Sequence, residues 1–283
     1  MKLLISLVLA GFWGHAALAT EGGGSNYLPG FYGDFQMGSL PGKGLYLSNL
    51  FTAYQDHTGA TGSAQEIPGL MYVPGNEILG ANFAVGVWPS VVVIKDHSNG
   101  NTLERLSFGD PYLMPVLLNW NWKDLQISLY EGIIAPVGYY QKDHLNIGRN
   151  IWTFDHNLSL TYNLPADNEL SFNFGFMNNT ENEATHYTTG DELHLDYVLG
   201  HYFTEEFAVG VVGSYYKQVT ADQAPKEILA QEYTESSTVG PVLMYNPTIA
   251  GKSISTSLKW LHEFDTQGHV RQDYIFFRLF YGF

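Results

Sequence analysis

The chain has 283 residues, with 28 Asp and Glu against 13 Lys and Arg, so its formal net charge at pH 7 is −15. Such an acidic balance argues against nucleic-acid binding, which needs basic patches to neutralise phosphates. The chain has no cysteine, and this excludes disulfides, thiolate metal ligands and a lipid-modified N-terminal cysteine.

Residues 1–19 have the pattern of a secretory signal peptide. Lys2 supplies a positive charge, Leu3–Ala10 an apolar stretch, and Ala17-Leu18-Ala19 a small-residue cleavage site. Cleavage after Ala19 leaves 283 − 19 = 264 residues and, because Lys2 is lost, a net charge near −16. No later window offers the roughly 18 apolar residues that a membrane-spanning helix needs. We therefore expect an exported protein that is not anchored by a helix.

The following segment, residues 20–44, is rich in glycine and does not alternate in polarity. Glycine loses much conformational entropy on ordering and proline lacks a backbone donor, so this segment is a poor strand. Two interpretations stay open. The segment is either a periplasmic leader or a partial plug that folds into the lumen of a barrel, a place that Tyr27, Phe31, Tyr32 and Phe35 would suit.

From residue 45 to residue 283 the chain alternates apolar and polar residues in segments of strand length. In Ile151–Leu164, for example, Trp152, Phe154 and Leu158 share one face, and Asp155 and Asn157 share the other. Strands are expected at Leu45–Tyr54, Ile78–Ile94 (interrupted at Trp88-Pro89), Met114–Trp122, Leu125–Leu129, Ile151–Leu164, Glu169–Met177, Glu192–Tyr202, Phe207–Tyr215, Thr238–Asn246, Ser253–Phe264 and Asp273–Phe283. Long loops are expected at 55–76, 96–113, 135–150, 178–190 and 218–237.

These strands are compatible with an outer-membrane barrel and with a soluble sandwich, which also alternates. The many aromatic residues on the apolar faces, the signal peptide and a terminal strand ending on Phe283 favour the barrel, whose outside faces lipid and whose inside faces water. At roughly 20–24 residues per strand with its loops, the chain predicts an all-β, antiparallel transmembrane barrel of about 12 strands, with 10 and 14 as the other even numbers. Its expected partners are outer-membrane lipid, lipopolysaccharide and, through Phe283, the barrel-insertion machinery.

An ordered series of short motifs resembles one known family. The motifs are Tyr32-Gly33-Asp34-Phe35, Phe108-Gly109-Asp110-Pro111, Ala135–Tyr140, Asn146–Phe154, Thr188–Glu192 and Gly240-Pro241. Together they resemble the outer-membrane family named after the meta-cleavage pathway of phenol degradation, and they span nearly the whole chain after residue 19. One departure is Val137, where the family usually has Thr. The resemblance implies a barrel associated with uptake of aromatic or otherwise hydrophobic compounds, and no catalytic residues are carried over from it.

Several charged residues are expected to face the lumen. Glu192, His194 and Asp196 project to one face of their strand, where they either bind a cation or a polar solute group, or simply solvate a wet interior. Arg278 is a candidate counter-charge for these acids. No metal-ligand spacing, phosphate loop or dinucleotide fingerprint is present, so no metal or cofactor is expected. The residues assigned to a lumenal solute path are Asp110, Asp155, Glu169, Glu192, His194, Asp196 and Arg278.

Three functions remain open. The first is a channel for passive uptake of small hydrophobic or aromatic solutes, with residues 20–44 as a gate. The second is an outer-membrane enzyme acting on lipid, for which His194 would be the residue to test, although the chain has no Gly-x-Ser-x-Gly motif. The third is a structural or surface-interaction barrel with a filled lumen.

Overall fold

The computed structural model describes residues 25–97, 102–142, 144–225, 233–249 and 252–283. These residues form strands but no helix, and thus no helix long and apolar enough to cross a membrane. The expected signal peptide, residues 1–19, lies outside the described residues.

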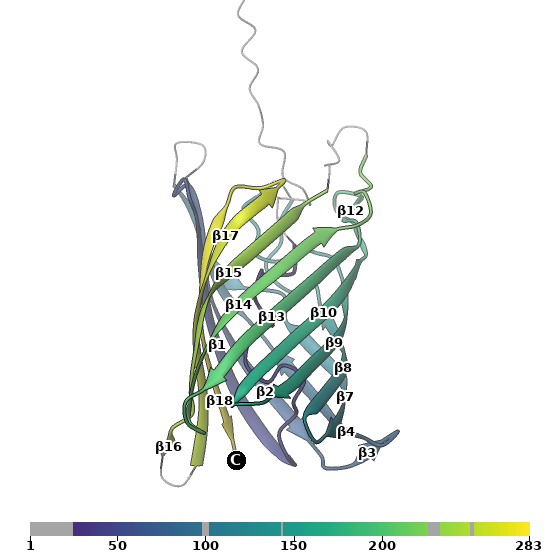
Figure 1. The fold of residues 1–283 in the computed structure, drawn as a ribbon. Coiled ribbons are helices and arrows are strands. Elements are labelled where there is room, and N and C mark those ends of the chain that lie inside the picture. Colours follow the sequence, from purple (N-terminus) through teal and green to yellow (C-terminus); the bar gives the residue numbers. More distant parts are fainter. Residues whose placement is uncertain (1–24, 98–101, 143, 226–232, 250–251) are drawn as a thin grey trace, which may run out of the picture.

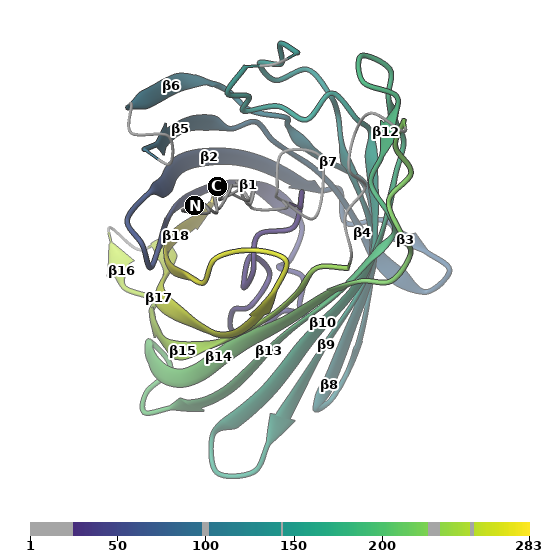
Figure 2. The same cartoon turned by 90° about the horizontal axis from the view of Figure 1, so that it is seen from above.

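Twelve antiparallel strands close into one barrel (Figures 1 and 2), which confirms the expected strand number. They are β1 (Gly44–Asp56), β2 (Thr61–Val73), β4 (Ala81–Trp88), β7 (Tyr112–Trp122), β8 (Leu125–Ile134), β9 (Thr153–Leu164), β10 (Asn168–Asn179), β13 (Glu192–Tyr202), β14 (Phe207–Gln218), β15 (Glu235–Tyr245), β17 (Lys252–Gln267) and β18 (Gln272–Gly282). The last strand pairs with the first, from Tyr46 opposite Gly282 to Asp56 opposite Gln272, so the sheet has no edge at this seam.

Six shorter strands complete the structure: β3 (Glu77–Ile78), β5 (Val91–Asp96), β6 (Leu103–Phe108), β11 (Glu181–Asn182), β12 (Tyr187–Thr188) and β16 (Thr248–Ile249). The strand is interrupted between β4 and β5 at Pro89-Ser90, where the sequence predicts an interruption. After this interruption β5 pairs with the first half of β2. Among the described strands, the single partner of β6 is β5.

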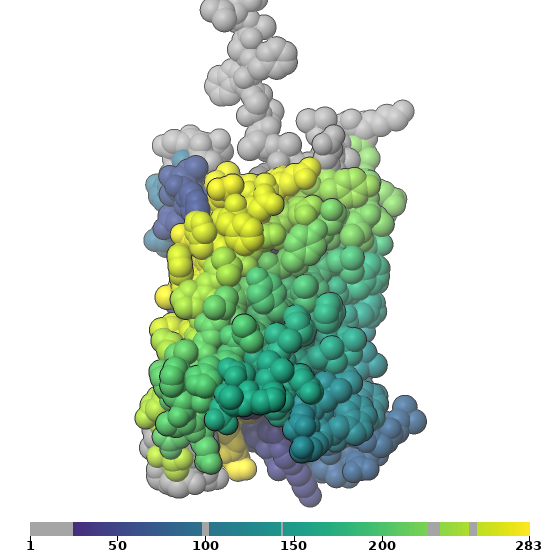
Figure 3. Space-filling model, in the orientation of Figure 1, coloured from purple at the N-terminus to yellow at the C-terminus, as the bar shows by residue number. Residues whose placement is uncertain are grey.

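The wall has a polar inside and an apolar outside. Along β9 the lumenal residues Asp155 and Asn157 are each 1% exposed, whereas Phe154 and Leu158 on the other face are 37% and 38% exposed. A soluble sandwich would bury the apolar set instead. In the space-filling view the side chains of neighbouring strands form a continuous wall (Figure 3).

The two ends of the barrel differ in their connections. At one end the turns between barrel strands are short, at 123–124, 165–167 and 203–206. The other end carries the long connections 135–152, 180–191 and 219–234 beside two short turns at 57–60 and 268–271. Outer-membrane barrels have short periplasmic turns and long extracellular loops. The end that carries 135–152 is therefore the extracellular mouth.

Two of the expected long loops are wrong in part. Most of 55–76 is the strand β2, and 96–113 contains the strand β6. The glycines and proline of β2 concealed it, yet Gly69 has a packing reason: a Cβ there would lie 2.0 Å from the indole of Trp88, which donates a hydrogen bond to Ser48 at 2.9 Å. In this strand a glycine makes room for an aromatic ring rather than marking a turn.

The segment at 25–43 lies inside the ring of strands, where its purple trace is visible from above (Figure 2). Phe35 joins Val198, Val212, Leu261 and Phe276 in an apolar cluster on the inner side of the wall. For the part of this segment that the structure describes, the position is inside the lumen rather than in a periplasmic leader.

The polarity of the wall predicts the effect of a charge on its outer face. Leu158 lies near the middle of β9, so Leu158→Arg should place a cation in the hydrocarbon and cost roughly 2–4 kcal/mol of folding free energy. The measurement is guanidinium unfolding of the protein refolded into lipid vesicles. Leu164→Arg, the same change at the end of the strand, is the control and should cost about 0–1 kcal/mol. Equal costs at the two positions would contradict the assignment of this face to lipid.

Candidate functional site

The inner face of β9, β10 and β13 forms a seat for the segment at 25–43. The Tyr27 hydroxyl donates to Asp196 Oδ2 at 2.9 Å, and the Gly33 amide donates to Asp196 Oδ1 at 3.2 Å. The Tyr32 hydroxyl donates to Asp155. Two carboxylates that face the lumen therefore hold one segment of chain by its hydroxyl and amide donors.

His194 lies at the centre of this seat. Its ring is stacked between Tyr27, at a centroid distance of 4.3 Å, and Tyr32, at 5.2 Å. Its Nε2 is 2.9 Å from Asp155 Oδ1, and its Nδ1 is 3.7 Å from Asp196 Oδ2. Space for the imidazole comes from Gly175 on the neighbouring strand, because a Cβ there would lie 1.9 Å from Nε2.

Two more of the predicted lumenal acids also bind the segment. Glu192 accepts hydrogen bonds from the hydroxyls of Ser25 and Tyr216, both at 2.8 Å. Glu169 accepts from the Gln36 amide at 2.6 Å and from Tyr202. Asp155, Glu169, Glu192, His194 and Asp196 are all buried and face the lumen. Of these five, Asp155 also lines the cavity described below.

The cations on the opposite wall bind the same segment. Arg278 Nη2 is 3.0 Å from Asp34 Oδ2, so its partner is an acid of the segment, and the expectation that it balances Glu192 and Asp196 is wrong. Lys259 on β17 donates to the carbonyls of Gly30 and Gly33. Sequence reasoning missed Lys259, although its place two residues before the lumenal Leu261 could have indicated it.

Asp110 has a different role. It lies between β6 and β7 and accepts the amides of Gly138 at 2.7 Å and Arg149 at 2.8 Å, so it fastens the connection 135–152 at the extracellular mouth. Burial raises the pKa of Asp110, and the two amide hydrogen bonds oppose that shift. Gly138 and Gly148 pack against this clamp so closely that a Cβ on either would lie within 3 Å of neighbouring atoms.

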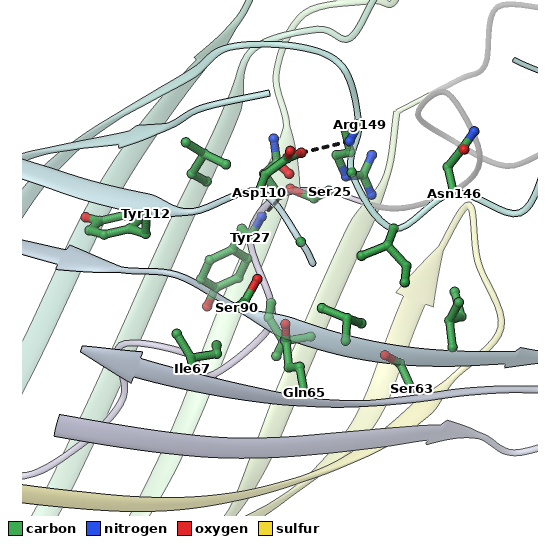
Figure 4. A pocket seen from close by; sticks show the side chains of 18 of the residues that line it. Ser25, Tyr27, Ser63, Gln65, Ile67, Ser90, Asp110, Tyr112, Asn146 and Arg149 are labelled. Carbon is green, nitrogen blue, oxygen red and sulfur yellow. Dashed lines mark hydrogen bonds between the residues drawn. The ribbon is translucent and has the colours of Figure 1, made fainter. Parts of the chain in front are cut away.

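A cavity of about 620 Å³ remains between the segment, the connection 135–152 and the wall formed by β2, β4 and β5 (Figure 4). Its lining is mixed. Ile67, Trp88 and Tyr112 contribute apolar surface, and Ser90 and Arg149 contribute polar groups. A space of this size and composition is typical of small-molecule sites, which run to about 300–1,000 Å³.

One pair and one group of three titratable residues bear on catalytic or metal chemistry. Asp155 and His156, neighbours on β9, point to opposite faces: Asp155 contacts His194 in the lumen, and His156 Nδ1 is 2.6 Å from Glu131 on the outer face. Outside the lumen, His57, His262 and Asp273 bring three potential metal-ligand atoms within 4.8 Å of one another. Their separation in sequence concealed this group, and hydrogen bonding of His262 to Asp273 at 2.8 Å accounts for part of its arrangement.

A solved structure with the same fold is the COG4313 outer membrane channel from Pseudomonas putida F1, with a TM-score of 0.77, 13% identity, and coverage of 91% of this chain and 100% of that chain. The NanC porin and the KdgM porin in complex with disordered oligogalacturonate are more distant. Each has a TM-score of 0.45, with 8% and 9% identity, coverage of 82% and 84% of this chain, and 98% and 99% of their own. A comparison with curated protein sequences gave no match.

At these identities the solved structures bear on the fold alone, which is that of an outer-membrane barrel. The model of one sequence family matches residues 53–279, most of the chain. The protein therefore belongs to the family described as "Putative MetA-pathway of phenol degradation".

Proposed function

We propose that this barrel is an outer-membrane channel for passive uptake of small hydrophobic or aromatic solutes, and that the segment at 25–43 is its gate. The observation that carries this proposal is a cavity of about 620 Å³ inside the barrel that is bounded on one side by that segment. A solute that reaches the cavity can pass only if the segment moves.

The composition of the cavity supports a solute with a large apolar part. Ile67, Val92 and Ile94 from the wall and Phe31 from the segment line it together with Trp88. Burial of apolar solute surface against such residues gains roughly 25 cal/mol per Å². A strongly hydrated sugar or ion would gain little from the same surface.

The attachment of the segment supports a gate rather than a permanent filling. Most of its anchors are hydrogen bonds to charged groups of the wall, such as Tyr27 to Asp196 and Ser25 to Glu192. Water can replace such hydrogen bonds when the segment leaves, because carboxylates and hydroxyls are readily hydrated. A segment held by a large apolar core alone would not be exchanged for water in this way.

The same geometry gives less support to an enzyme that acts on lipid. A catalytic histidine needs a nucleophile or a substrate within hydrogen-bond reach. His194 is enclosed by two tyrosine rings, and among the described residues its hydrogen-bond partner is Asp155. The cavity, in turn, offers no support to the third possibility, a fully filled structural barrel.

Removal of the gate is the first test. A chain of residues 44–283 should show a larger single-channel conductance in planar bilayers than residues 20–283, since the barrel strands start at Gly44. The opened pore should prefer cations, because Asp155, Glu169, Glu192 and Asp196 then face water. Circular dichroism and heat-dependent gel mobility serve as folding controls. If the two folded forms conduct equally, the segment is not a gate.

A milder test loosens the gate without removing it. The double change Tyr27→Phe and Tyr32→Phe keeps both rings against His194 but removes the two hydroxyl donors to Asp196 and Asp155. Each hydrogen bond to a charged group contributes roughly 1.5–3 kcal/mol, so the open fraction in bilayer recordings should increase at least about tenfold. Tyr139→Phe removes a hydroxyl that bonds Gln141 outside the seat and should leave gating unchanged. No increase in the double variant would contradict the role assigned to these anchors.

A further inference from the structure

Arg149 is a cavity-lining cation whose backbone, rather than its side chain, makes the printed hydrogen bonds. Its amide donates to Asp110 at 2.8 Å, and its carbonyl accepts from Asn182 Nδ2 at 3.4 Å, so its backbone is held from two sides. Its guanidinium makes no ion pair or hydrogen bond with any residue that the structure describes. The backbone of Arg149 is thus fixed, and its guanidinium lines the cavity without a hydrogen-bond partner among the described residues.

The acids near Arg149 already have donors of their own. Both Glu192 oxygens accept hydroxyl hydrogen bonds, from Ser25 and Tyr216, and both Asp110 oxygens accept backbone amides. Burial lowers the pKa of Arg149, and the negative charges of Glu192 and Asp110 oppose this shift. Arginine is effectively always protonated in proteins. The group that is missing beside the guanidinium is therefore an acceptor, not a donor.

Arg149 and part of the apolar lining lie on different sides of the cavity. In Figure 4, Arg149 and Asn146 lie on one side of the pocket, and Tyr112 and Ile67 lie on the opposite side. Trp88 lies against Tyr112, with a distance of 5.9 Å between the ring centroids. This arrangement matches a solute with one charged head and an apolar body.

We propose that Arg149 is the headgroup ligand of the cavity and that the solute is a hydrophobic carboxylate, with the acid on an aromatic or aliphatic body. The inference rests on the proposed uptake function and narrows its solute class. The planar guanidinium pairs with a carboxylate through two parallel N–H···O hydrogen bonds, a geometry that a neutral hydroxyl cannot reproduce. The apolar residues on the opposite side of the cavity bind the body and exclude water from the ion pair.

The test is a calorimetric titration of the refolded protein in lipid nanodiscs with three probes of equal size. These are 3-phenylpropionate, 3-phenylpropan-1-ol and 3-phenylpropylamine, which share one ring and chain and differ only in the head. The wild-type protein should bind the acid roughly ten- to a hundredfold more tightly than the alcohol, the range expected for a hydrogen-bonded ion pair. Arg149→Gln should remove this preference and leave the affinity for the alcohol within about twofold.

A matched control is available in the same connection. Lys142 is exposed, and Lys142→Gln changes the net charge by the same amount as Arg149→Gln. It should leave the preference for the acid intact, whereas a loss in both variants would mean that overall charge, not a headgroup contact, decides binding. Arg149→Lys serves as a second variant, because it keeps the charge, loses the planar fork and should retain part of the preference.

Failure of this inference can be told apart from failure of the uptake function. If the wild-type protein binds the alcohol as tightly as the acid, or binds the amine most tightly, Arg149 is not the headgroup ligand but the cavity is still a solute site. If no probe binds and removal of residues 20–43 changes no conductance, the uptake function itself is wrong. An acid preference that survives in folded Arg149→Gln also overturns the assignment.

Discussion

Charged side chains that face the inside of a narrow barrel must be hydrated or hydrogen-bonded, because an unpaired buried carboxylate costs several kcal/mol or more. The rest of this structure follows from how that requirement is met. Asp155, Glu169, Glu192 and Asp196 are supplied with donors not by water alone but by a segment of the same chain. The acids that a water-filled barrel would leave to solvent thus hold a segment of the chain inside this lumen.

For the proposed gate, this arrangement makes the closed state specific and lets water replace its anchors. Hydroxyl and amide donors fix the segment at defined points, and His194 between two tyrosine rings fixes its orientation. The net free energy of each such bond is small, because water offers a competing partner in the open state. In the proposed gate, water can replace the polar anchors when the segment leaves, and the apolar contacts of Phe35, Tyr27 and Leu40 oppose its release.

Much of the fold could be predicted because one physical signal, period-two alternation, decides which face of each strand meets lipid. It served well at β9 and β10, where polar and apolar residues alternate without interruption. It failed at β2, where Gly69 and Pro68 imitate a turn, because the reason for Gly69 is the ring of Trp88 nineteen positions later. Alternation describes neighbours in sequence and carries no information about packing partners from another strand.

The same limit explains which site residues could be foreseen. The two-residue alternation of a strand places Glu192, His194 and Asp196 on one lumenal face. Their shared contact with the segment could not be predicted, because Tyr27 and Tyr32 come from a stretch without periodicity. The assignment of Arg278 to the wrong acids has the same origin.

The site is also asymmetric, and under the proposed function this asymmetry separates the gate from the solute site. The segment lies against the polar wall of β9, β10 and β13, where its donors find acceptors. The wall of β2, β4 and β5 carries Ile67 and Trp88 together with Ser63 and Gln65, and the cavity lies against it. In the proposed function one wall holds the gate and the other holds a solute. Arg149, with its backbone fixed by Asp110, is then the charged group that faces the solute. A solute that pairs with Arg149 therefore need not compete with the anchors of the segment, so binding and gating can be altered separately.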